Sequence, residues 1–102
     1  MTEVRSQPSP DGATLTLSIR GRFDFSAHQA FRRGYEPFVK EHTKVVVDLR
    51  QVDYLDSSAL GMLLLLREQA GDDRRRVTLQ VRTPEVRNIL EVSNFDRLFQ
   101  IS

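Results

Sequence analysis

The sequence contains no cysteine and no tryptophan among its 102 residues. Without cysteine the chain has no disulfide framework, no thiol nucleophile and no thiolate metal site, which is compatible with a reducing cytoplasm. Its histidines, His28 and His42, have no neighbours at metal-ligand spacing, and we interpret them as ordinary surface residues. We therefore expect a cytoplasmic protein that needs no metal and no other cofactor.

Long apolar runs are also missing. The longest, residues 59–66, contains a glycine and falls far short of the ~20 residues that cross a bilayer. The opening stretch MTEVRSQPSPDG lacks the apolar region of a signal peptide. Lysine and arginine number 15 against 14 acidic residues, so the net charge of +1 gives no whole-molecule attraction to polyanions. We expect no nucleic-acid partner and no direct membrane insertion.

Motifs for nucleotide binding and hydrolysis are absent as well. The chain has no P-loop and no G-x-G-x-x-G fingerprint, so the sequence gives no support for nucleotide binding. It has no G-x-S-x-G elbow, and nothing in the sequence brings a histidine to a serine as a catalytic triad requires. A binding module is therefore expected in place of an enzyme.

The most informative stretch is residues 45–69, VVVDLRQVDYLDSSALGMLLLLREQ. The nearly continuous apolar run within residues 44–50 predicts a central strand covered on both faces. Asp56, Ser57 and Ser58 suit the start of a helix, whose first N–H groups lack internal partners, so one of them is expected to cap it. The helix that follows is apolar beyond a single stripe, which indicates that it is largely buried or partly reserved for a partner.

Residues before this stretch predict a hairpin and a helix. A short pattern at 3–7 and clear alternation at 14–20 indicate two strands joined by a turn rich in proline and glycine. Ser26 and Gln29 have the spacing of a capping box, so a helix is expected to begin there. Glycine and proline within residues 34–37 predict that this helix kinks or ends near that point.

Residues after it predict a parallel crossover and a last helix. The run at 72–76 places aspartates beside arginines without interleaved aromatic residues, which is typical of a solvated loop. Alternation at 77–82 indicates a strand that pairs in parallel with the central one through a right-handed crossover. Residues 83–84, Thr-Pro, start a helix that Asn94 interrupts. The whole chain, 1–102, is expected to form one small α/β domain.

The stretch VDLRQVDYLDSSALGMLLL resembles the signature of the STAS family of anti-sigma factor antagonists, whose members carry a D-S-S/T-G-L-G-like segment. Strand, Asp-Ser-Ser turn, Leu-Gly step and apolar helix occur in the family's order, and the rest of the chain aligns with it. Ala59 replaces the glycine that the family most often has, whereas Gly61 is kept. The resemblance implies a STAS fold, with a mixed sheet of four or five strands and helices mainly on one side.

The resemblance also implies a function. Ser57 occupies the family's phosphorylated position, and in the family the unphosphorylated antagonist sequesters an anti-sigma factor, typically one with an ATP-dependent serine kinase fold. A serine phosphatase restores the active form. The competing interpretation is that the serines serve to cap the helix, and the two roles are compatible.

The GRFDFS stretch resembles the family's G-x-x-D loop, so Asp24 and Ser26 are expected to line the same surface as Ser57, although a turn and a helix cap explain them equally well. The full set of expected partner-binding residues is Asp24, Ser26, Asp56, Ser57, Ser58, Ala59, Gly61 and Met62. A STAS accessory subunit of a membrane lipid-transport ABC complex is the alternative function, because such subunits rely on the same helix face without kinase chemistry at Ser57.

Overall fold

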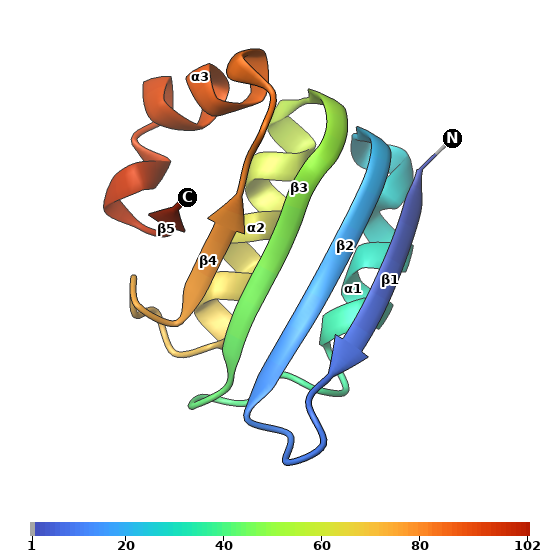
Figure 1. Ribbon diagram of the computed structural model, residues 1–102, viewed down its shortest axis with the longest axis vertical. Coiled ribbons are helices and arrows are strands. Elements are labelled where there is room, and N and C mark those ends of the chain that lie inside the picture. The colour runs from blue at the N-terminus through green and yellow to red at the C-terminus, as the bar shows by residue number, and fades with distance from the viewer. Residues whose placement is uncertain (1) are drawn as a thin grey trace.

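Five strands form one mixed sheet in the order β1-β2-β3-β4-β5 in the computed structural model, which describes residues 2–102 (Figure 1). The strands are β1 (Glu3–Pro8), β2 (Thr14–Phe23), β3 (Lys44–Leu55), β4 (Val77–Gln80) and β5 (Gln100–Ile101). The helices are α1 (His28–Tyr35), α2 (Ser57–Gln69) and α3 (Pro84–Val92), with short 3₁₀ turns η1 (Phe25–Ala27) and η2 (Phe95–Arg97). β1 pairs antiparallel with β2, and the other neighbours are parallel, as the predicted crossover requires.

The β1–β2 hairpin is confirmed, and its turn is held locally. The Ser9 N–H donates to the carbonyl of Thr14 at 2.8 Å, and the Asp11 carboxylate accepts from the Ala13 N–H at 3.0 Å. Gly12 has φ +73, a conformation that glycine adopts without steric cost. Figure 1 shows this turn at the end of the molecule opposite to the start of α2.

The helices α1 and α2 cover one face of the sheet, and the other face stays open (Figure 1). On β3, Val45 and Val47 are buried in the core, whereas Val46 between them is half-buried on the open face. The prediction of a central strand covered on both faces is therefore wrong. Consecutive valines reflect the high strand propensity of β-branched residues, which a strand with one wet face also tolerates.

β3 extends beyond the strand that its apolar run predicts, and its pairing with β2 contains two irregularities. Ser18 pairs with Asp48 and Arg20 with Gln51, so two residues of β3 stand opposite one of β2. A second irregularity follows, since Gly21 and Arg22 are adjacent whereas their partners, Val52 and Tyr54, are not. Such bulges bend and twist a strand without ending it. They carry β3 to residue 55, directly before Asp56.

α1 ends at Tyr35, as its glycine and proline predict, and it packs closely on the hairpin. The Ser6 hydroxyl donates to the carbonyl of Gly34 at 2.7 Å. A Cβ at position 34 would lie 2.8 Å from the Ser6 Oγ, so the close contact needs glycine. Ala30 and Phe38, two apolar residues of this segment, are exposed.

α3 begins after Thr83 with Pro84 as its first residue, as predicted. The Thr83 hydroxyl does not cap the helix; it donates to the carbonyl of Val52 at 3.2 Å and so ties the start of α3 to β3. Asn94 ends the helical segment in a left-handed conformation, φ 60. Phe95 and Phe99 then bury their rings in the core, which fixes the C-terminal segment.

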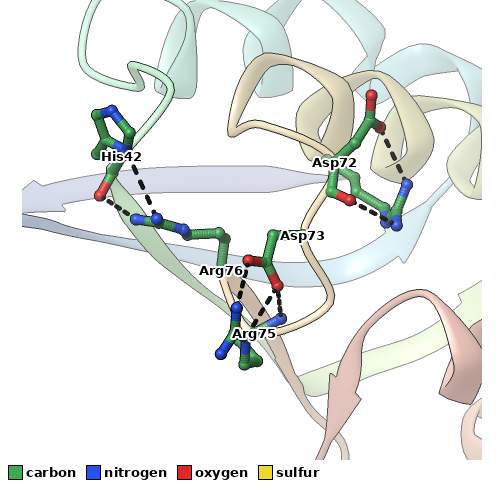
Figure 2. A network of polar contacts seen from close by, with 6 residues as sticks. His42, Asp72, Asp73, Arg75 and Arg76 are labelled. Carbon is green, nitrogen blue, oxygen red and sulfur yellow. Dashed lines mark hydrogen bonds and ion pairs between the residues drawn. The ribbon is translucent and has the colours of Figure 1, made fainter.

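The arginine-rich loop before β4 is largely exposed, as predicted, and several of its polar side chains also bond within the chain (Figure 2). Arg76 donates to the carbonyl of His42 at 2.8 Å, which joins this loop to the start of β3. Arg75 pairs with Asp73 at 3.1 Å. The neighbouring arginines thus bond within the chain, because carbonyl and carboxylate oxygens lie within reach of their guanidinium groups.

Candidate partner-binding site

Two junctions, each where a strand leads into a helix, lie side by side at one end of the sheet. β2 and β3 are parallel and end together, with Phe23 paired to Leu55. The next residues, Asp24 and Asp56, therefore follow their strands at the same end of the sheet. The Asp56 N–H also donates to the carbonyl of Phe23 at 3.4 Å, which links the junctions directly.

At the β3–α2 junction the cap is Asp56. Its Oδ1 accepts from the N–H of Ala59 at 2.9 Å, and its backbone is extended, as a residue that caps a helix requires. Ser57 is then the first helical residue, with an exposed side chain, and Ser58 is half-buried. The expectation that one of the three residues caps the helix is confirmed, and the aspartate does so, leaving the Ser57 side chain at the surface.

At the β2–η1 junction the cap is Asp24. Its Oδ1 accepts from both the N–H of Ser26 at 3.0 Å and the Ser26 hydroxyl at 2.5 Å. The predicted capping box of Ser26 and Gln29 is wrong, because the carboxylate two residues earlier caps a 3₁₀ turn in which Ser26 is the central residue. The hydrogen bonds from Ser26, above all from its hydroxyl, lower the pKa of Asp24, and Arg22 adds to the effect. Asp24 is therefore charged at neutral pH.

The predicted site residues divide by exposure. Ser26, Ser57 and Gly61 are exposed, and a Cβ built at position 61 would meet nothing within 4 Å. Ala59 and Met62 are buried, with side chains that pack in the core. A partner can touch the exposed residues directly, while the buried pair supports the surface from beneath.

Exposed apolar side chains extend this surface beyond the residues predicted. Phe25 is 70% exposed, and its ring stacks on the His28 ring with centroids 6.0 Å apart. Along α2, Leu64 and Leu65 are 40% and 53% exposed. The exposure of Phe25 could have been inferred from its position in a polar loop. The exposure of Leu64 and Leu65 could have been inferred from the run of four leucines, which cannot all face the core.

The guanidinium group of Arg22 lies beside the β2–η1 junction, a contact that the sequence did not predict. The guanidinium of Arg22 lies 4.1 Å from the centre of the Tyr54 ring, and its Nε is 3.5 Å from the carboxylate of Asp24. Because Arg22 pairs with Tyr54 across the sheet, the parallel register produces this contact. It partly balances the negative charge at this end of the molecule.

Metal ligation and membrane crossing find no structural support in the described part of the chain. No group of three or more histidine, aspartate or glutamate side chains there could hold a metal ion. None of the helices within residues 2–102 combines the length and the apolar character that a membrane span needs.

Comparison with known proteins identifies the fold. Residues 6–100 match the family described as "Mlab, STAS domain". The chain belongs to the STAS family. A STAS-domain containing protein of Pseudomonas aeruginosa is 54% identical to this STAS chain over 99 residues, covering 97% of the chain and 98% of the relative.

Solved structures agree with this assignment. An anti-sigma factor antagonist from Mycobacterium paratuberculosis superposes with a TM-score of 0.83 at 20% identity, covering 99% of this chain and 85% of that one. The anti-sigma factor antagonist SpoIIAA in its unphosphorylated form gives a TM-score of 0.79 at 16% identity, with 98% and 88% coverage. The predicted STAS fold, a mixed sheet with helices mainly on one side, is confirmed.

Proposed function

We propose that this STAS chain is an anti-sigma factor antagonist whose binding surface is switched by phosphorylation of Ser57. The proposal rests mainly on the start of α2, where two neighbouring residues have different roles. Asp56 caps the helix, and Ser57 stands exposed in its first turn. Support also comes from the relatives of this fold, two of which are themselves anti-sigma factor antagonists.

The chemistry of the switch follows from charge. Transfer of a phosphoryl group to the Ser57 Oγ adds about −1.5 to −2 charge and three acceptor oxygens. The start of a helix tolerates this anion, so the fold is expected to persist. Asp56 nearby is also anionic, and unit charges ~4 Å apart repel by roughly 4 kcal/mol at an effective dielectric of ~20, less when exposed. A partner packed over both groups would be expelled without a rearrangement of the core.

The partners follow from the same scheme. The unphosphorylated chain sequesters an anti-sigma factor, placing it over Ser57, Gly61 and the exposed side chains beside them. That anti-sigma factor, or a serine kinase of the same ATP-dependent type, transfers the γ-phosphoryl group of ATP to the Ser57 Oγ and releases ADP, and a serine phosphatase hydrolyses the phosphate from Ser57. Phe25 and Leu64 add apolar contact area to the surface, which favours a protein partner over a small ligand.

The accessory subunit of a membrane lipid-transport ABC complex remains the second candidate. The exposed Leu64 and Leu65 favour it, because they offer an apolar helix face that needs no modification to bind. In that case the permease or ATPase subunit would cover α2, and Ser57 would stay unmodified.

The deciding experiment combines phosphosite mapping with affinity capture. The chain is purified from its native cells with phosphatases inhibited, and its intact mass and modified residues are determined under growing and stationary conditions. Phosphate on Ser57 in a fraction that changes with conditions supports the switch. Capture of an anti-sigma factor by Ser57→Ala but not by Ser57→Asp supports it further, with Ser93→Ala as a control. An unmodified Ser57, together with equal capture of transporter subunits by both variants, would favour the second candidate.

A further inference from the structure

The open face of the sheet, on the side away from α1 and α2, carries a group of arginines. They are Arg5 on β1, Arg20 on β2, Arg50 on β3 and Arg82 after β4, and we call them the arginine face. Arg20 stands between Glu3 on β1 and Gln51 on β3 in the register, and Arg82 is close enough to Asp48 for its charge to help lower the pKa of that carboxyl. A shallow hollow of about 180 Å³ is lined by both cations and anions, among them Arg5, Arg20, Glu3 and Asp48.

Half of these cations are already neutralised. The Arg50 guanidinium donates to both carboxylate oxygens of Asp48, each at 3.0 Å. Arg5 pairs with Glu3 at 2.8 Å. Arg20 donates to the neutral Gln51 amide oxygen at 2.6 Å, and neither Arg20 nor Arg82 forms an ion pair within residues 2–102. The arginine face therefore has an excess of positive charge.

The backbone positions of the two unneutralised arginines lie near one row across the sheet, offset by the bulge between β2 and β3. Ser18, Asp48 and Gln80 are paired neighbours on β2, β3 and β4, and Arg20 and Arg82 each follow their strand's member by two residues. Adjacent strands are roughly 4.8 Å apart, so about 10 Å separates the two backbone positions. An extended chain covers that distance in roughly three residues.

We propose that the arginine face binds an acidic protein segment, which crosses the strands in extended conformation and gives one carboxylate to Arg20 and another to Arg82. Guanidinium and carboxylate form paired, charge-assisted hydrogen bonds, and the Arg50–Asp48 pair shows that geometry on this face. Side chains on one side of an extended chain are two or four residues apart, so the segment needs carboxylates at that spacing, within reach of both long arginine side chains. Such a partner differs from the one proposed for Ser57, since it contacts the opposite side of the sheet.

Two other polyanions fit this face less well. A nucleic-acid strand would stack its bases on free aromatic rings, but the Tyr54 ring is already covered by Arg22 at 4.1 Å. An anionic membrane calls for large apolar side chains that enter the bilayer, and among residues 2–102 this face exposes a single large apolar side chain, that of Tyr54.

Binding of fluorescein-labelled octaglutamate to the full chain, followed by fluorescence anisotropy at about 20 mM salt, tests the proposal. Arg20→Glu with Arg82→Glu should weaken binding at least tenfold. Arg33→Glu with Arg97→Glu makes the same charge change at exposed positions away from the face and should change binding less than twofold. Arg20→Gln with Arg82→Gln serves if the first pair fails to fold, and it should also weaken binding. Ser57→Asp should bind the peptide as the unaltered chain does.

The proposal fails if the control pair weakens binding as much as the test pair, because net charge alone would then explain the effect. It also fails if octaglutamate does not bind. Tighter binding of a single-stranded octanucleotide, or of vesicles containing phosphatidylglycerol, would assign the face to nucleic acid or to a lipid surface instead.

Discussion

The two junctions at the end of the sheet use the same residue type with different results. At the first, Asp24 binds both the N–H and the hydroxyl of Ser26, so that serine is committed within its own turn. At the second, Asp56 binds the N–H of Ala59 three residues on, and Ser57 lies between them with its side chain exposed. The aspartate cap thus engages the serine hydroxyl at the first junction and leaves the Ser57 side chain exposed at the second, as the proposed phosphorylation requires.

The length of the helix that follows also differs. Asp56 starts an uninterrupted α-helix of 13 residues whose inner side includes the buried Leu63 and Leu66, whereas Asp24 starts a 3₁₀ turn of three residues that leads into α1, of eight residues. Packing therefore stabilises the second junction more than the first. The junction that holds Ser57 is expected to be the more rigid of the two.

The largest expected effect is on partner binding. Ser57→Asp should weaken binding of the captured anti-sigma factor by roughly 100-fold, because a like charge placed in an interface costs several kcal/mol and each 1.4 kcal/mol is tenfold. Ser26→Asp, at the other junction, should have a smaller effect. Isothermal titration calorimetry measures both. Equal losses for the two variants would remove the distinction between the junctions.

A smaller effect is expected on stability when the second cap is removed. Asp56→Ala should lower the free energy of unfolding by about 1 kcal/mol, since the N–H of Ala59 loses its acceptor. For a domain of this size that corresponds to a fall in Tm of roughly 4–8 °C, measured by circular dichroism. Asp56→Asn keeps an acceptor and is the matched control; if it destabilises as much as alanine, the cap is not the cause.

Removing the first cap should cost less. We expect Asp24→Ala to lower the free energy of unfolding by less than Asp56→Ala does, because Asp24 caps a single short turn. Since Asp24 and Ser26 bond to each other, the double variant Asp24→Ala with Ser26→Ala should lose less than the two single variants added together. Urea unfolding of the four proteins completes the cycle. Strict additivity would show that the hydroxyl–carboxylate bond contributes nothing to stability.

The smallest effect concerns pH. The pKa of Asp24 in the folded chain lies below its ordinary value of 3.8, chiefly because the Ser26 hydroxyl donates to it. A group with a lowered folded pKa stabilises the fold above its unfolded pKa and loses that contribution as pH falls through the folded value. The stability difference between wild type and Ser26→Ala should therefore shrink as pH falls from 5 toward and below the folded pKa. A difference that stays constant over this range would contradict the assignment.

Much of the fold is readable from local patterns. Alternation at 14–20 and 77–82 identified strands with one wet face, and the strand–helix–strand order required parallel pairing. The glycine and proline after Phe31 placed the end of α1 correctly. These features depend on side-chain period and backbone restriction, which act over a few residues and are visible in a sequence.

The features that sequence reasoning missed depend on contacts between distant segments. Val46 belongs to an apolar run, yet its exposure depends on which sheet face the helices cover. The bulges that lengthen β3 arise from its register with β2. At the site, both Asp24 and Ser26 have side chains that can cap the turn before α1, and Asp24 forms the cap. Ala59 and Met62 were expected at the binding surface, and their burial became visible once the orientation of α2 was known.

The β1–β2 turn is a suitable place to attach a label or a tether. It lies at the far end from the start of α2, and its tip residues Asp11 and Gly12 are exposed (Figure 1). Exposed loop tips of this kind tolerate insertions. A fluorophore, an affinity tag or a tether to a sensor chip placed there would leave both the Ser57 surface and its helix unobstructed, so binding and release could be followed in real time on an immobilised chain.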